Sequence, residues 1–174
     1  NGLGRHGALP VGQSGAMTEL DAEAIALLEG GSALLIGTVM ANGAPHAARA
    51  WGLDVVGRDP FTVRVLLDAT QEPLLANLAE RANVAITATS VVSFRSLQLK
   101  GTCSGIEPTE EEDHERFVRY FTAMYDDIES VDHTSREIAQ RLNPDTLVAV
   151  RCAISEFYDQ TPGPDAGRPL DVNG

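Results

Sequence analysis

The stretch that decides the fold reads FRSLQLKG and spans residues 94–101. In a β-strand, successive side chains point to opposite faces of the sheet. Leu97 and Leu99 therefore share one face, and Ser96, Gln98 and Lys100 share the other. The second face presents a hydroxyl, a carboxamide and an ammonium group in a row. This pattern predicts a strand whose apolar face joins the core and whose polar face either meets solvent or holds a polar ligand.

The composition is that of one globular domain. The chain has 174 residues, of which 43% are hydrophobic, so it is long enough to bury a substantial core. It contains neither a run of about 18 apolar residues nor an apolar leader, so no membrane span and no signal peptide are expected. A net charge of -12 should repel phosphate backbones and anionic lipids. We therefore expect no nucleic-acid and no membrane partner, and a small molecule as the substrate.

Two cysteines, Cys103 and Cys152, both fall within predicted strands and lack a CxxC spacing. Two buried free thiols are the favoured interpretation, and a disulfide is the alternative. Free thiols agree with a reducing compartment, so a cytoplasmic location is expected.

Periodicity and turn signals predict one domain over residues 17–170. Residues 1–16 are expected to be a flexible arm or a remnant of recombinant expression, and residues 171–174 a tail. Strands are expected at residues 33–40, 44–56, 61–68, 84–91, 94–106 and 146–158. Helices are expected from Thr18 to Gly30, at residues 71–81, behind a capping box that begins at Thr109, and between Thr134 and Asn143. Residues 161–170 are expected to have no regular structure.

These elements indicate a mainly β fold with helices, of the α+β class. Asn42-Gly43 is a strong hairpin signal between the first two strands. Six strands joined mostly by short connections predict one antiparallel sheet that curls into a barrel with helices over its ends. The helix behind Thr109 carries an apolar stripe that favours core packing: Phe117, Phe121, Met124, Tyr125 and Ile128.

Few residues suggest chemistry directly. The sequence has none of the common nucleophile, phosphate-loop or zinc-protease signatures, and its four histidines lack the spacing of metal ligands. Arg49 and Trp51 have the same parity on the second strand, so a guanidinium and a flat ring project to one side. That side could hold a planar anion, or Trp51 could be a core residue with Arg49 at its rim.

Taken together, residues 24–170 resemble the pyridoxamine 5'-phosphate oxidase-like family of flavin-binding split barrels. The resemblance rests on the order of elements, the arginine on the second strand, the Arg-led fifth strand that ends in glycine, and the late strand that ends in Glu156-Phe157-Tyr158. It implies a six-stranded antiparallel Greek-key split barrel that forms a homodimer. It also implies that FMN binds in clefts at the dimer interface.

The resemblance further implies which residues touch the cofactor. Arg49 matches an arginine that contacts the FMN phosphate, and Ala50, Trp51 and Gly52 match strand positions beside the isoalloxazine. Arg95 and Ser96 match an arginine and a flavin-contacting glutamine on the fifth strand. Tyr158 matches a cofactor-contacting tryptophan, and Arg168 a late arginine of the same site. Gln98 and Lys100, on the polar face of the fifth strand, complete the set.

One segment departs from the family. Where the family has a Ser-Arg-Lys segment that clamps the phosphate, residues 68–74 hold no basic residue and add Asp68 and Glu72. A phosphate would lose charge-assisted contacts there. Arg49 and Lys100 would have to substitute, together with Thr70 and Gln71 at the start of the short helix. Either FMN sits differently, or the cofactor is FAD, a deazaflavin or haem.

The expected function is that of a flavin-dependent oxidoreductase acting on an unidentified small molecule. No catalytic side chain is named, because a flavin carries the redox chemistry itself. One alternative is a non-enzymatic protein that binds flavin or haem. For haem, His46 is the candidate axial ligand, although its parity places it opposite Arg49. A second alternative is a dimer with a degenerate pocket.

Overall fold

The computed structural model describes residues 20–170, so the expectations for residues 1–16 and 171–174 lie outside the described residues. The elements in chain order are α1 (Ala22–Glu29), β1 (Ala33–Val39), β2 (Pro45–Arg58), β3 (Phe61–Asp68), α2 (Glu72–Glu80), β4 (Asn83–Thr89), β5 (Ser96–Pro108), α3 (Glu111–Asp132), α4 (Arg136–Gln140), β6 (Leu147–Asp159) and β7 (Arg168–Pro169).

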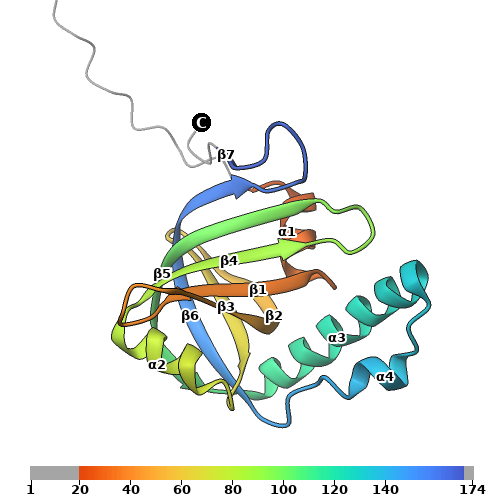
Figure 1. The fold of residues 1–174 in the computed structure, drawn as a ribbon, viewed down its shortest axis with the longest axis horizontal. Coiled ribbons are helices and arrows are strands. Elements are labelled where there is room, and N and C mark those ends of the chain that lie inside the picture. Colours follow the sequence, from red (N-terminus) through yellow and green to blue (C-terminus); the bar gives the residue numbers. More distant parts are fainter. Residues whose placement is uncertain (1–19, 171–174) are drawn as a thin grey trace, which may run out of the picture.

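Six antiparallel strands close into a barrel. Around the barrel the order is β1-β2-β3-β6-β5-β4, and β4 pairs again with β1. The crossing from β3 to β6 makes the connection a Greek key rather than a simple meander. Closure pairs both edges of each long strand. Figure 1 shows α3 and α4 beside the barrel and α2 below it. The predicted α+β split barrel is confirmed.

The barrel interior is filled by alternate side chains of every strand. Leu34 and Ile36 of β1 are buried, and so are Val63 and Val65 of β3. The rings of Phe61 and Phe157 meet edge to face with centroids 5.1 Å apart. The interior therefore has no room for a cofactor, and any site must lie on the outer side of the strands.

Helix α3 is fixed to the outer side of β2 and β3 by a buried network of charges. Arg64 of β3 donates to the carboxylate of Asp113 at 2.7 Å, and also bonds Glu107. Asp113 in turn pairs with Arg116, which reaches Asp54 of β2. The bond to Asp113 raises the pKa of Arg64. Burial opposes ionisation of Asp113, but the bonds from Arg64 and from the Glu110 N–H, with the charges of Arg64 and Arg116, together outweigh burial and lower the pKa of Asp113.

Several predicted boundaries are wrong by a few residues because side-chain caps decide where the helices begin. Helix α1 starts at Ala22 rather than at Thr18, which lies outside the described residues. Its cap is Asp21, whose carboxylate accepts the Ala24 N–H at 2.7 Å. Helix α3 is capped at Glu110 rather than Thr109, and the Asp113 carboxylate accepts the Glu110 N–H at 2.9 Å. Its predicted apolar stripe does pack on the core, as expected.

The strand ends also differ from the prediction. Strand β4 ends at Thr89 and β5 begins at Ser96, because Phe94 adopts a φ of 59° that a strand does not allow. The segment after β6 was predicted to be irregular, yet Arg168–Pro169 pairs with Tyr158 and Asp159 as β7. No helix within residues 20–170 is both long and apolar enough to cross a membrane.

The expectation of two free thiols is wrong. Cys103 of β5 and Cys152 of β6 are directly paired across the sheet, with Cα atoms 3.9 Å apart, and form a disulfide. The sequence placed both cysteines in strands, but it did not give the register that sets them opposite each other. Free thiols were the basis for expecting a cytoplasmic location, and the disulfide removes that basis.

Candidate functional site

The outward-pointing side chains of five strands form one continuous surface, which we call the outer face. Residues that are directly opposite in an antiparallel pair point to the same side of the sheet. The register therefore defines two neighbouring rows from β2 to β6: Arg49, Leu35, Thr87, Gln98 and Tyr158 in one, and Ala47, Gly37, Ala85, Lys100 and Glu156 in the other.

At the β2 end of the outer face, Arg49 lies between the barrel and α3. Its guanidinium carbon is 4.4 Å from the centroid of the Trp51 ring, and it donates to the Met124 sulfur. Trp51 also meets Phe117 edge to face, with centroids 6.3 Å apart. Burial raises the pKa of Tyr120, and the nearby Arg49 acts in the opposite direction. Arg49 and Trp51 project to one side as predicted, but Trp51 is only 5% exposed and belongs to the core, with the half-buried Arg49 at its rim, which is the alternative that the sequence left open.

At the β6 end, Lys100 lies over the ring of Tyr158. Its Nζ atom is 4.3 Å from the ring centroid. The Tyr158 hydroxyl donates to Glu156, and this bond raises the pKa of Tyr158. Each end of the outer face therefore carries a cation stacked on an aromatic ring.

A ladder of polar contacts connects β4 and β5 beside Lys100. Gln98 donates to the Thr87 hydroxyl at 3.2 Å, and the Ser96 and Thr89 hydroxyls are 2.7 Å apart. The polar face predicted for the fifth strand is confirmed by these contacts. Ser96 is nevertheless buried, because the segment after β6 covers it and Thr161 accepts its N–H.

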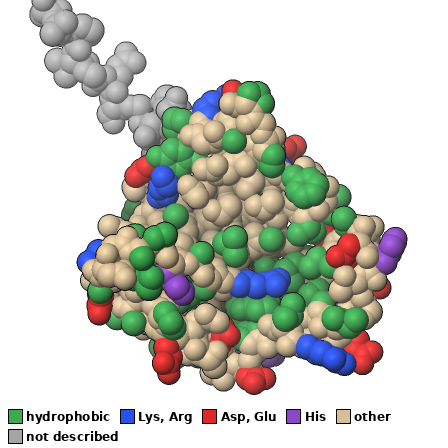
Figure 2. Space-filling model, in the orientation of Figure 1, with side chains coloured by type: hydrophobic (Ala, Val, Ile, Leu, Met, Phe, Trp, Pro, Cys, Tyr) green, Lys and Arg blue, Asp and Glu red, His purple; other side chains and the backbone are tan. Residues whose placement is uncertain are grey.

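Between the two stacked cations, one row of the outer face consists of small residues, and the other carries Leu35, Thr87 and Gln98. A groove of about 520 Å³ runs over this region, lined among others by Gly37, Val39, Pro45, Ala47 and Ala85. Leu35 and Val39 of β1 are 52% and 41% exposed. Figure 2 shows hydrophobic side chains crossed by a basic one in the hollow between the barrel and α3. The outer face thus has an apolar groove, with Arg49 at its β2 end and, at its β6 end, Lys100 opposite Glu156.

No known sequence family matches the chain, and no curated protein matches it by sequence. Solved structures match it in fold. An F420 reductase is 17% identical, and the match covers 76% of this chain and 93% of that chain with a TM-score of 0.52. HupZ from Group A Streptococcus is 13% identical over 86% of this chain and 100% of that chain, with a TM-score of 0.53. A protein assigned as a pyridoxamine 5'-phosphate oxidase from Lactobacillus delbrueckii is 16% identical over 80% and 93%, with a TM-score of 0.51.

The chain has the split-barrel fold. In this split barrel, Arg49 on β2 and Lys100 on β5 are separated by β1 and β4. Three strand spacings of about 4.8 Å place them about 14 Å apart along the sheet. The predicted site residues on the outer face therefore form two groups within one subunit rather than one cluster.

The remaining predicted site residues lie outside these two groups. Ala50 is fully buried in the barrel, and Gly52 packs under Arg116 of α3. Arg95 forms an ion pair with Glu23 of α1 at 2.8 Å. Arg168, on β7, lies 3.9 Å from Asp159 at the end of β6. Arg95 and Arg168 thus lie beside carboxylates of this chain, at α1 and at the end of β6.

The segment after β3 satisfies its own polar groups. Thr70 donates both its N–H and its hydroxyl to one oxygen of Asp68, at 2.8 and 2.7 Å. Gln71 is the residue before α2 and makes no side-chain capping bond. An internal carboxylate thus takes the donors that an anion could have used.

Sequence reasoning missed several contributors to the outer face. Thr87 and Thr89 were detectable, because they alternate with Ile86 and Ala88 along the predicted strand. Tyr120 and the Met124 contact with Arg49 were not detectable, since they depend on where α3 crosses β2. Glu156 entered the sequence argument only as part of a family motif, yet it is the hydrogen-bond partner of Tyr158.

Proposed function

We propose that this protein is a homodimeric flavin-binding protein that acts as an oxidoreductase on a small molecule. One observation carries the proposal. Arg49 and Lys100 share the outer face, each stacks on an aromatic ring, and within residues 20–170 neither forms an ion pair with a carboxylate. Cations placed this way suit a flat, negatively charged ligand.

A dimer would bring together the two groups of site residues that are separated within one subunit, Arg49 with Trp51 and Lys100 with Tyr158. A second copy related by a two-fold axis would use the same outer face, because such an interface is isologous. Small side chains at Gly37, Ala47 and Ala85 would let the two sheets approach closely. The exposed Leu35 and Val39 would be covered in the interface. Arg49 of one subunit would then lie close to Lys100 of the other, and the cleft would contain both cations.

Each residue has a role in this arrangement. Arg49 would bind the negative charge of the cofactor chain while resting on the buried Trp51 ring, and Tyr158 would form a wall of the cleft. Lys100 would place positive charge near the ring system. When bound, a flavin supplies the transfer of a hydride or electron pair. The protein's own part is to orient the ring and to stabilise its negative charge.

The loop after β3 limits which residues could bind the phosphate of a cofactor. Residues 68–74 contain no basic side chain, and the Thr70 donors are already bonded to Asp68. Arg49 would therefore be the main phosphate contact. FMN, FAD and a deazaflavin all remain candidates for the same cleft. Haem is the weaker candidate: His46 lines the same groove, but its strand position pairs with the buried Thr38 and has the parity opposite to Arg49.

Ligand titration tests the proposal. FMN, FAD and a deazaflavin are titrated into the protein, and binding is followed by absorbance and fluorescence. We expect Arg49→Ala to weaken binding by about 1.5 to 3 kcal/mol, the value of a hydrogen bond to a charged group. Arg58→Ala is the matched control, since this exposed arginine lies at the far end of the same strand. Equal losses in both variants would remove Arg49 from the site, and no binding by the parent protein would favour the degenerate pocket.

A further inference from the structure

The turn between β4 and β5 presents an aromatic side chain to solvent. We call residues 90–95 the hairpin tip. Within residues 20–170, Phe94 is the only aromatic residue that is exposed, at 61%, and Val92 is 53% exposed two positions before it. Figure 1 shows this turn at the right of the barrel, on the side of the molecule where α3 ends. The tip therefore carries two apolar side chains that nothing in the single subunit covers.

The backbone at Phe94 has a conformation that suits other residues better. Its φ is 59°, in the left-handed region, which bulky side chains rarely adopt and which glycine and asparagine occupy more readily. The turn is nevertheless well bonded. The Phe94 N–H donates to the Ser90 carbonyl at 2.9 Å, and the Ser90 N–H donates to the Arg95 carbonyl at 2.9 Å. Phe94 is thus held in place by the turn, although folding alone would favour a different residue there.

The strand register shows which part of the outer face lies at the same end as the hairpin tip. Thr89, the last residue of β4 before the tip, pairs with Ala33 of β1. Leu35, two residues later in β1, pairs with Arg49 of β2. Because β1 and β2 are antiparallel, Trp51 lies on the side of Arg49 that is nearer to the tip. This is also where α3 lies against β2, with the hollow between them that Figure 2 shows.

Two-fold symmetry determines where the tip would lie on a second copy. In the proposed dimer, Arg49 of one subunit lies close to Lys100 of the other, so the axis exchanges β2 with β5. Such an axis runs along the strands between β1 and β4, and it leaves each position at the same end of the strands. The tip of one subunit is then carried to the hollow between β2 and α3 of the other. The hydrophobic lining of that hollow and the nearby Arg49 both suit an aromatic ring.

We propose that the hairpin tip forms a contact between subunits, in which Phe94 and Val92 of one subunit insert into the hollow between the barrel and α3 of the other. A second copy of this chain is the occupant because the contact is continuous with the proposed outer-face interface and occurs twice in each dimer. The aromatic ring at a left-handed position then serves association rather than folding. This contact rests on the proposed dimer and is independent of the identity of the cofactor.

Phe94→Asn separates association from folding. We expect the dissociation constant of the dimer, measured by analytical ultracentrifugation, to rise at least about tenfold, because each dimer loses two aromatic contacts. Asparagine tolerates the left-handed region, so the urea midpoint should not fall when both proteins are diluted until they are monomeric. Ile106→Asn is the control, since Ile106 is 40% exposed on β5 but far along the strand from the tip, and the dissociation constant should be unchanged. An unchanged dissociation constant for Phe94→Asn, or a less stable monomer, would overturn the proposal.

Photo-cross-linking tests where the tip lies on the second copy. A benzophenone amino acid replaces Phe94, and isotope-labelled and unlabelled subunits are mixed so that mass spectrometry identifies links between subunits. We expect links to peptides of β2 or α3 in the other subunit. Links within one subunit, or to other parts of the barrel, would contradict the placement. A parent protein that stays monomeric would reject the proposed dimer itself, whereas a dimer that dissociates in Leu35→Glu but not in Phe94→Asn would reject the hairpin contact alone.

Discussion

The absence of a side chain at Gly101 allows β5 and β6 to approach closely. A Cβ atom built at this position would lie 2.0 Å from the carbonyl oxygen of Ala153, within the facing backbone. The side chains of Lys100 and Tyr158, at one end of the outer face, project from the same two strands. The spacing of this strand pair is thus decided by a residue that has no side chain of its own.

Gly101→Ala should therefore disrupt the strand pair. We expect it to lower the free energy of unfolding by about 3 kcal/mol or more, since neither backbone can yield cheaply. The measurement is urea unfolding followed by circular dichroism. Gly37→Ala is the control, because its Cβ would make only an ordinary contact, 3.5 Å from the Ala85 oxygen. Equal stability of the two variants would show that the strands separate easily at Gly101.

The alternation of side chains along each predicted strand, which we call parity, predicted more of the outer face than the residue types did. The alternation of β2 correctly placed Arg49 beside Trp51, and that of β5 placed Gln98 with Lys100. Parity fails where the backbone leaves the strand: of the two placements expected for Arg95, the opposite face of the strand or a bend at its start, the structure shows the bend, from which Arg95 pairs with Glu23 of α1. Parity also cannot report contacts between a strand and a helix, which is why the contact between Arg49 and Met124 of α3 was missed.

Helix α3 owes its position to charge as well as to its apolar stripe. Arg64 and Asp113 are 3% and 1% exposed and bond each other directly. Gly31, before β1, lies so close to α3 that a Cβ there would be 2.4 Å from the Met124 nitrogen. The two contacts fix both the start and the middle of the helix, and so hold Met124 against Arg49.

Asp113→Asn removes one charge from this network without changing the shape of the side chain. We expect a loss of about 3 kcal/mol in the free energy of unfolding, because the Arg64 charge stays buried with a poorer partner. Glu111→Gln, an exposed change in the same helical turn, should cost no more than about 0.5 kcal/mol. Urea unfolding at pH 7 measures both. A small effect for Asp113→Asn would mean that Glu107 alone satisfies Arg64.

The same network predicts the acid sensitivity of the fold. The pKa values of Asp113 and Glu107 are lowered in the folded state. Their contribution is complete above the ordinary carboxyl pKa and is lost as pH falls through the folded values. We expect the stability of the parent protein to fall between about pH 5 and pH 3, and Asp113→Asn to show a shallower fall. A parallel pH dependence would place the acid-sensitive carboxylates elsewhere.

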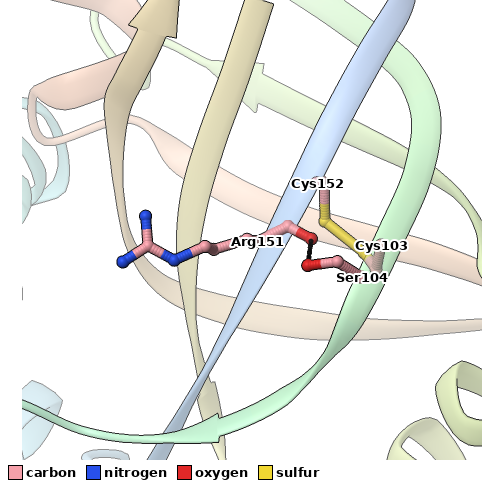
Figure 3. Close-up of a disulfide and its surroundings, with 4 residues drawn as sticks. All are labelled: Cys103, Ser104, Arg151 and Cys152. Atoms are coloured by element: carbon pink, nitrogen blue, oxygen red, sulfur yellow. Dashed lines mark hydrogen bonds between the residues drawn. A yellow bond between two sulfur atoms is a disulfide. The ribbon is translucent and has the colours of Figure 1, made fainter.

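Element types were predictable, whereas their ends were not. Period-two alternation identified the six long strands, and a capping signal identified α3 within one residue of its start. The short β7 could not be predicted, because Arg168 and Pro169 pair only after the preceding loop has folded back on β6. The disulfide between Cys103 and Cys152 (Figure 3) was missed for a related reason, since the register of β5 against β6 depends on bulges that the sequence does not mark.

Barrel closure is a property of the whole chain. The pairing of β3 with β6 joins residues that lie from 79 positions apart, in Asp68↔Leu147, to 91 positions apart, in Thr62↔Ala153. Local signals predicted six strands curled into a barrel, but they cannot specify which distant strands pair, and the Greek-key order was expected only through the resemblance to a known family. Closure also gathers the rows of the outer face, because it sets β2 and β6 on opposite sides of β1, β4 and β5.

Net charge and the outer face together predict how the dimer should respond to salt. Each chain carries a charge of -12, so two subunits repel each other at long range. The outer face between the stacked cations carries an apolar groove, and apolar contacts there are not weakened by salt. Screening should therefore strengthen association, and we expect the dissociation constant of the dimer to decrease as ionic strength rises. Analytical ultracentrifugation over a salt series measures this.

Leu35→Glu tests whether the outer face is the interface. The side chain is 52% exposed in the middle of the row that runs from Arg49 to Tyr158, so the substitution would bury a like charge on each subunit. We expect this variant to be monomeric and to bind flavin at least about tenfold more weakly, because the cleft needs groups from both subunits. Ile138→Glu is the matched control, since this residue is 59% exposed on α4, away from the outer face. It should stay dimeric with unchanged affinity. A monomeric parent protein that still binds flavin tightly would instead place the whole site within one subunit, where Arg49 and Lys100 are too far apart to act together.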